Sequence, residues 1–150
     1  MAGSEGPPGE TGSPGRVLGL DLGDARIGVA ISDPERRVAV PHGTIHVGQP
    51  PGELKAVAAL VRELLASAVV VGHPRSMSGA SGPKAQQAEA FAEALRAVVP
   101  VPVELQDERL STVEADRSLR EAGLDGRRRR TVVDEAAATV ILNAWLDARG

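Results

Sequence analysis

A wholly apolar stretch at residues 68–72, flanked by two segments of helical character, limits the fold more than any other feature of this sequence. Its letters, AVVVG, include no polar side chain, which is typical of a central parallel strand covered on both faces. Residues 52–66 before it repeat apolar side chains at the spacing of an amphipathic helix. A second helix is expected over residues 83–97. A strand between two helices predicts an α/β domain.

Other segments extend this pattern into a larger sheet. Three strands joined by short links are expected at residues 16–22, 26–32 and 36–41. Because short links favour antiparallel neighbours, these strands should form an antiparallel meander. A fifth strand is expected at 101–108, followed by helices at 111–122 and 131–148 with a loop at 123–130. The sequence therefore predicts a mixed sheet, partly antiparallel and partly parallel.

The length of 150 residues suits one domain with a single sizeable core. Residues 1–15 carry glycine at every third position from Gly3, with few apolar side chains, so we expect a disordered tail at 1–15 and an ordered domain over 16–150. The lack of cysteine excludes disulfides and thiolate zinc sites. No apolar run approaches the roughly 18 residues of a membrane span, and no signal peptide is recognised, so we expect a cytoplasmic protein without membrane contact.

Asp21 interrupts a run of strand-forming apolar residues at 16–22. Burial of an ionised carboxylate without a partner is costly, so a cation should lie nearby, and a metal ion is one candidate. Asp21 lies near the carboxyl end of its strand, where sites in α/β sheets tend to form, and Gly23 and Gly28 allow a ligand close to the backbone. The alternative is a hairpin in which Asp21 accepts hydrogen bonds from turn N–H groups.

Two acids, Asp107 and Glu108, end the strand expected at 101–108. Because side chains alternate between faces, only one of them can face a site, and Asp107 shares its face with the apolar residues of the strand. Glu108 is therefore the candidate, and Asp107 would replace it if the strand ended one residue earlier. The alternative is a pair of solvated carboxylates, with Arg109 as a salt-bridge partner.

Asp134 is expected in the first turn of the helix at 131–148, at the edge of an apolar stripe. The stripe consists of Val133, Ala137, Val140, Ile141 and Ala144. At about 100° per residue, Asp134 should face the sheet and Glu135 should face solvent. The alternative is a capping box formed by Thr131 and Asp134, since acids favour helix N-termini.

Asp21, Glu108 and Asp134 are more informative as a set than alone. Carboxylates that converge from separate chain segments at one end of a sheet form an oxygen-rich site for Mg²⁺ or Mn²⁺. Such ions can clamp the attacking and leaving oxygens of a phosphodiester. The predicted activity is metal-dependent phosphodiester hydrolysis, with Asp21 and Asp134 as ligands and Glu108 as a ligand or as the residue that positions the attacking water.

Basic side chains near these acids are candidates for holding a nucleic-acid backbone. They are Arg26, Arg75, Arg127, Arg128, Arg129 and Arg130, to which the hydroxyl of Ser76 is added. The arginine run precedes Asp134, which favours phosphate contacts, and a solvated charged face is the alternative. The net charge of −3 argues against a generic polyanion surface, and two aromatic residues, Phe91 and Trp145, are too few for a base-stacking platform. The three histidines, His42, His46 and His73, show no recognisable ligand spacing and are expected to be structural, with His73 the best placed of the three to line the site.

Four segments in order give the chain a resemblance to a known family. DLGDARIGVAISD, VVVGHPRSMSG, QDERLST and VDEAAATVILNAWLD resemble the motifs of the YqgF or RuvX family of Holliday junction resolvase-like proteins, over residues 16–148. The resemblance implies a ribonuclease H-like fold, a five-stranded mixed sheet flanked by helices. It also maps the acidic residues of the family onto Asp21, Glu108 and Asp134.

The resemblance further implies divalent-metal-dependent cleavage, with a role in processing the 5′ end of pre-16S rRNA. Action on branched DNA, as a junction resolvase, is the alternative, and a catalytically inactive nucleic-acid-binding module on the same fold is another. We expect nucleic acid as the partner and a monomer or a weak homodimer. The loop GHPRSMSG departs from the family because His73 stands at a position that is usually apolar.

Overall fold

The computed structural model describes residues 14–23, 25–48, 52–74, 82–107 and 126–149, with the backbone alone for 126–133. Within these ranges one sheet is formed by β1 (Arg16–Leu22), β2 (Arg26–Ser32), β3 (Ala39–His46), β4 (Ala66–His73) and β5 (Val103–Asp107). The helices of the same ranges are α1 (Gly52–Glu63), α2 (Pro83–Arg96) and α4 (Gly126–Arg149). In this part of the chain no helix combines the length and apolar character that crossing a membrane requires.

The sheet is mixed and has the strand order β3-β2-β1-β4-β5. β1, β2 and β3 form an antiparallel meander, whereas β4 runs parallel to both β1 and β5. β4 pairs on both edges and its apolar centre is buried, as a wholly apolar sequence requires. The predicted five-stranded mixed sheet and α/β class are therefore confirmed.

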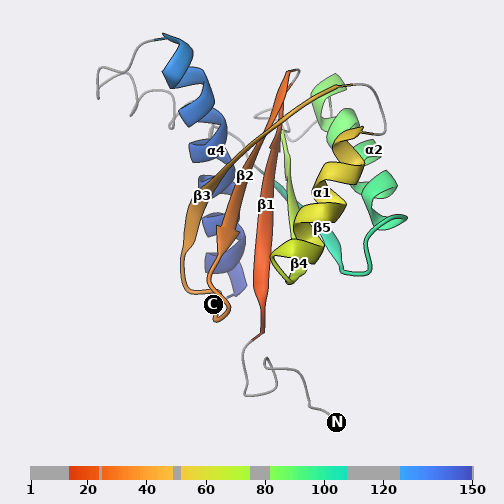
Figure 1. Ribbon diagram of the computed structural model, residues 1–150, viewed down its shortest axis with the longest axis vertical. Coiled ribbons are helices and arrows are strands. Elements are labelled where there is room, and N and C mark those ends of the chain that lie inside the picture. The colour runs from red at the N-terminus through yellow and green to blue at the C-terminus, as the bar shows by residue number, and fades with distance from the viewer. Residues whose placement is uncertain (1–13, 24, 49–51, 75–81, 108–125, 150) are drawn as a thin grey trace.

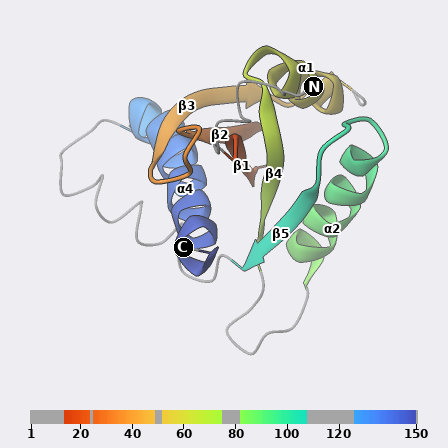
Figure 2. The same ribbon diagram turned by 90° about the horizontal axis from the view of Figure 1, so that it is seen from below.

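Helices cover both faces of the sheet, as Figures 1 and 2 show. We call the face under α1 and α2 the α1/α2 face and the opposite one the α4 face. Leu18 and Leu20 of β1 belong to the apolar core of the α1/α2 face, while Val17 packs with Leu142 and Trp145 on the α4 face. Because neighbouring residues of a strand project to opposite faces, this alternation decides which polar side chains can share a site.

The turn between β2 and β3 displaces the third strand from its expected place. The sequence predicts a strand at 36–41, but β3 begins at Ala39. Oδ1 of Asp33 accepts hydrogen bonds from the backbone N–H groups of Arg37, at 2.7 Å, and Val38, at 2.9 Å. Arg36 has a φ of 60°, which no strand residue adopts. The prediction was wrong because the Asp33 side chain bonds backbone N–H groups that a longer strand would use for pairing.

The last helix begins earlier than predicted. α4 starts at Gly126, so the loop expected at 123–130 is wrong for residues 126–130. Arginine is a good helix former, and the arginine run therefore extends the helix instead of interrupting it. As a consequence, Asp134 lies in the third turn of α4 and Thr131 lies inside the helix, so the capping box is also wrong.

Two predicted segments fall partly or wholly outside the described residues. Residues 1–13 of the predicted tail and the helix expected at 111–122 are not among them. At Pro14 and Gly15 the chain already contacts the domain, because Arg36 donates hydrogen bonds to both carbonyl oxygens. The division at residue 15 stays a prediction.

Two glycines allow α4 to approach the sheet backbone closely. A Cβ atom on Gly19 would lie 2.8 Å from Cβ of Leu142. A Cβ atom on Gly28 would overlap the backbone oxygen of Asp134. No side chain fits at either place, because a packed interior has no room to accept it. We call Gly19 and Gly28 the glycine seam.

An aromatic and ionic cluster holds the C-terminal part of α4. The centroid of the Trp145 ring lies 4.0 Å from the guanidinium of Arg149 and 5.6 Å from that of Arg36. Nε1 of Trp145 donates a hydrogen bond to Glu104 at 3.2 Å, and Arg149 donates to the same carboxylate oxygen. Burial lowers the pKa of Arg36 below its ordinary value, and Glu104 opposes that shift. The cluster joins α4 to β5 and to the β2–β3 turn.

We expect Gly28→Ala to destabilise the fold by about 1–3 kcal/mol or more, since the added methyl group must displace helix backbone. Gly48→Ala is the matched control, because a Cβ there meets no atom within 4 Å, and it should change stability by less than about 0.5 kcal/mol. Urea unfolding of both variants measures the difference. Equal stabilities would contradict the close approach of α4 to β2.

We expect Asp33→Ala to destabilise the protein at neutral pH and to lose this effect in acid. Backbone hydrogen bonds, the one from Val38 first, lower the pKa of Asp33 below its ordinary value of 3.8. A carboxylate with a lowered pKa in the folded state stabilises it above the unfolded pKa, and the contribution disappears as the pH falls through the folded pKa. Urea unfolding at pH 7 and pH 2.5 should show the wild type and the variant converging in acid. A difference that grows on acidification would contradict this role.

Candidate functional site

Asp21 projects from the α4 face of the sheet. It pairs directly with Gly28 of β2, and directly opposite residues of an antiparallel pair project to the same face. A side chain on Gly28 would point at the backbone of Asp134, so Asp21 points toward the same helix. Asp21 is partly exposed and is the penultimate residue of β1. It therefore lies at the carboxyl end of that strand, on the side that α4 covers.

Asp134 faces the sheet at the same end of the molecule. Its backbone lies against Gly28, and its side chain is 20% exposed. Ala138 and Ile141, four and seven residues later, are buried against the sheet, as helical spacing requires of residues on the same side as Asp134. The expected apolar stripe was partly wrong, because Val140 is 37% exposed and Ala144 is also exposed.

Arg26 forms an ion pair with Asp134. Its Nε donates a hydrogen bond of 2.7 Å to Oδ2 of Asp134, and the two side chains are 25% and 20% exposed. Arg26 lies at the start of β2, two residues before Gly28, and so projects to the same face. The phosphate contact that the sequence predicts for Arg26 stays a prediction, and its Nε is bonded to the Asp134 carboxylate.

Asp107 is oriented away from this face. β5 contributes Val103 and Leu105 to the core of the α1/α2 face, and Asp107 follows them at alternate positions. Glu104 has the opposite orientation, because it contacts Trp145 of α4. Glu108 lies outside the described residues. Of the two acids at this strand end, Asp107 therefore projects to the face of the sheet opposite to that of Asp21.

The other predicted phosphate-binding residues are described only in part. Arg75 and Ser76 lie outside the described residues. The backbone of the arginine run, Arg127, Arg128, Arg129 and Arg130, forms the first turns of α4. At 1.5 Å per residue, this run precedes Asp134 by roughly 6–10 Å along the helix axis.

His73 faces the opposite side of the sheet from Asp21. Its Nε2 lies 2.7 Å from Oε2 of Glu89 on α2, and its side chain is 13% exposed. The position follows from β4, in which Val69 and Val71 belong to the core of the α1/α2 face. His73 thus attaches the end of β4 to α2, which agrees with the structural role expected of it, and it lies on the face of the sheet opposite to that of Asp21.

Gly28 is the site residue whose importance the sequence did not reveal. It was expected to leave room for a ligand, whereas the space beside it is filled by the backbone of α4. The partner of Arg26 was also missed, because Asp134 is 108 positions away in the chain. No local pattern encodes such a pair.

The arrangement brings two carboxylates to one face and one end of the sheet. Asp21 and Asp134 supply hard oxygen donors, and the guanidinium of Arg26 is paired with Asp134. Among the described residues no group of three His, Asp or Glu side chains is close enough to hold a metal ion. The third predicted ligand, Glu108, is not part of that set.

Over most of its length the chain is similar to known proteins of one family. A family model described as Holliday junction resolvase, RuvX, matches residues 15–148. A relative from Mycobacterium bovis (strain BCG / Pasteur 1173P2) is 49% identical over 150 residues, which cover 95% of this chain and 88% of the relative. One from Pelotomaculum thermopropionicum is 46% identical over 136 residues, 90% of this chain and 88% of the relative. The names of both mark them as candidate pre-16S rRNA nucleases.

Solved structures agree on the architecture. T. thermophilus RuvC in complex with Holliday junction substrate matches with a TM-score of 0.53 and 19% identity, covering 89% of this chain and 94% of that one. Fowlpox virus resolvase with Holliday junction DNA matches with a TM-score of 0.53 and 10% identity, covering 89% and 98%. At such identities the likeness shows the fold alone, which is the predicted ribonuclease H-like fold. Together with the family model and the close relatives, it establishes that this chain belongs to the RuvX family.

Proposed function

We propose that this protein is a metal-dependent nuclease that hydrolyses phosphodiester bonds of pre-16S rRNA in the cytoplasm. The observation that carries the proposal is the packing of α4 on Gly28, through which Asp134 shares a face and a strand end with Asp21. Two carboxylates from distant segments repel each other, and a fold keeps such a pair where a cation offsets the repulsion. The names of the close relatives support the choice of substrate.

The residues at this place fit Mg²⁺ or Mn²⁺. The donors are carboxylate oxygens, which these hard cations prefer, and both carboxylates are partly exposed. Asp21 and Asp134 would hold the ion. Glu108 would be the third ligand, because continued alternation along β5 gives it the face opposite to that of Asp107. When bound, the ion would stabilise the negative charge that develops on the phosphate oxygens.

The other residues bind and orient the substrate in this proposal. The arginine run at 127–130, at the positive end of α4, would neutralise backbone phosphates within about two helical turns of Asp134. Arg75 and Ser76 would contact phosphates of the same strand. Arg26 would neutralise the Asp134 carboxylate through its ion pair while no metal ion is bound. Glu108 would alternatively orient the attacking water.

We expect Asp21→Asn and Asp134→Asn each to lower Mg²⁺-dependent cleavage by at least about 100-fold, because an amide replaces a charged ligand. The substrates are a transcript that contains the 5′ leader of 16S rRNA and a four-way DNA junction, each incubated with and without Mg²⁺. Cleavage of the junction alone would favour the resolvase activity over the proposed one.

Asp147→Asn is the matched control, because it makes the same chemical change at an exposed position near the other end of α4. It should leave cleavage unchanged. If Asp21→Asn cleaves the transcript as fast as Asp147→Asn does, the protein is a binding module and the nuclease proposal fails.

We expect Mg²⁺ to stabilise Arg26→Met more than it stabilises the wild type. The guanidinium is the cation that offsets the charge of Asp134, so its removal should cost about 1–3 kcal/mol and leave more repulsion for the metal to relieve. Thermal unfolding with and without saturating MgCl₂ gives the shift in Tm for each protein. A smaller Mg²⁺-induced shift in Arg26→Met would show that Arg26 supports metal binding instead of competing with it.

A further inference from the structure

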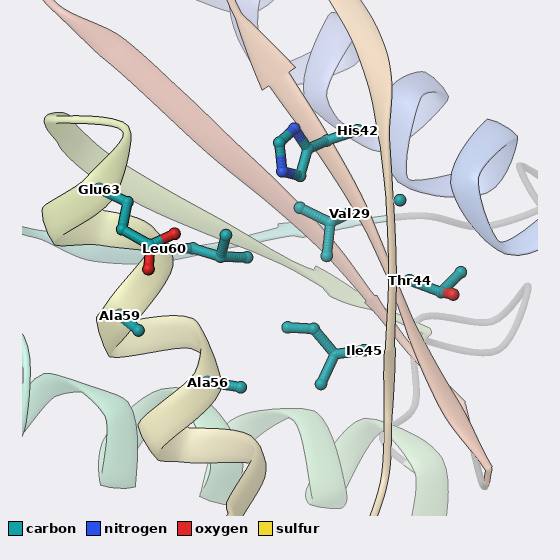
Figure 3. A pocket seen from close by; sticks show the side chains of 9 residues that line it. Val29, His42, Thr44, Ile45, Ala56, Ala59, Leu60 and Glu63 are labelled. Atoms are coloured by element: carbon teal, nitrogen blue, oxygen red, sulfur yellow. The ribbon is translucent and has the colours of Figure 1, made fainter.

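A pocket of about 390 Å³ lies between the edge strand β3 and helix α1. Figure 3 shows side chains from both elements projecting into it. Val29 and Ile45 form the wall on the sheet side, and Leu60 forms the wall on the helix side. Two aliphatic walls that face each other across an open groove suit a flat apolar body better than a round one.

A β-bulge directs His42 into this pocket. Val29 pairs with Gly43 and Ala30 pairs with Pro41, so His42 is an extra residue in β3 without an opposite partner. Bulges redirect side chains in this way. The imidazole of His42 therefore projects into the same space as Ile45 (Figure 3). A Cβ on Gly43 would meet no atom within 4 Å, so the rim beside His42 is open.

The polar groups of the pocket define what it can bind. Glu63 supplies a carboxylate from α1, opposite His42 (Figure 3), and an ionised carboxylate only accepts hydrogen bonds. The lining residues include no Lys or Arg, so the pocket lacks the side chains that most often hold a phosphate. The matching ligand has a flat apolar body, stacks on an imidazole and carries adjacent N–H donors on one edge.

We propose that this pocket binds an unstacked guanine base of the nucleic-acid substrate. Guanine presents N1–H and the 2-amino group side by side, and a carboxylate accepts both. Adenine, cytosine and uracil each place a hydrogen-bond acceptor beside their N–H donor. That acceptor would repel the Glu63 carboxylate, which is itself only an acceptor. The scarcity of aromatic residues in this chain is compatible with the pocket, because aliphatic walls and one imidazole replace an aromatic platform.

The pocket and the acidic site are separated by the sheet. Val29 projects to the α1/α2 face, whereas its neighbour Gly28 lies under Asp134 on the α4 face. Asp21 is on β1, two strand spacings from β3, or about 10 Å across the sheet. A single strand that passes around the β3 edge would place its base in the pocket while a phosphate a few nucleotides away reaches Asp21. In this detail the inference rests on the proposed function.

Titration of the full chain with 5′-GMP, 5′-IMP and 5′-AMP, without divalent cations, tests the pocket. The three nucleotides share the phosphate, and IMP differs from GMP only by the 2-amino group. We expect GMP to bind about tenfold more tightly than IMP or AMP, with amide NMR shifts at Ile45 and Leu60. Glu63→Gln should remove this preference, because an amide cannot accept both N–H groups as a carboxylate does.

Two further variants separate this binding from a loss of fold. Ala56→Leu fills the pocket from α1 with a good helix former and should abolish the GMP-induced shifts. Asp147→Asn should bind GMP as the wild type does. Equal affinity for the three nucleotides, or a GMP preference that survives Glu63→Gln, would overturn the proposal.

Two other outcomes distinguish the occupant and the underlying activity. Tighter binding of N-acetyl-arginine amide than of GMP at these residues would identify a protein guanidinium as the occupant and would overturn the guanine assignment. Selective GMP binding by a chain that cleaves no transcript in Mg²⁺ would support the pocket while the nuclease proposal fails.

Discussion

The close contact of α4 with the glycine seam is the constraint on which the rest of the site depends. Helices usually rest on side chains, but at Gly19 and Gly28 this helix reaches the sheet backbone. The contact fixes α4 both along and across β1 and β2. Because Gly28 lies opposite Asp21 and beneath Asp134, the same contact sets the relation between the two acids. Because α4 packs on these two glycines, Asp134 of this helix lies on the same face of the sheet as Asp21.

The sheet also divides the polar residues between two sides. Asp21, Arg26 and Asp134 belong to the α4 face, while His73 and Asp107 belong to the α1/α2 face with Glu89. Repulsion between the acids makes the Arg26 ion pair valuable at these partly buried positions, where charge is screened less than in bulk water. β3 is an edge strand, and the bulge at His42 lies on that edge between the two faces.

Much of this architecture could be predicted because it follows from local patterns. The apolar run of β4, the periodicity of α1 and the alternation along β5 each encode their own element and the face of each side chain. The start of α4 was missed because a run of like charges suggests a loop, although arginine favours helix. The Arg26–Asp134 pair and the fit of Gly28 against α4 depend on segments over 100 residues apart, which no periodicity records. For the candidate site, the sequence indicated the acidic residues, but it did not indicate which side chains and backbone groups lie beside them.

The cluster around Trp145 gives the protein a built-in optical probe. The chain has one tryptophan and no tyrosine, so its near-ultraviolet emission comes from a single indole. That ring is almost fully buried and contacts two guanidinium groups at the end of α4 remote from Asp134. Its fluorescence should therefore report whether α4 is packed on the sheet. Ligands that bind near Asp21 and Asp134 should leave it unchanged.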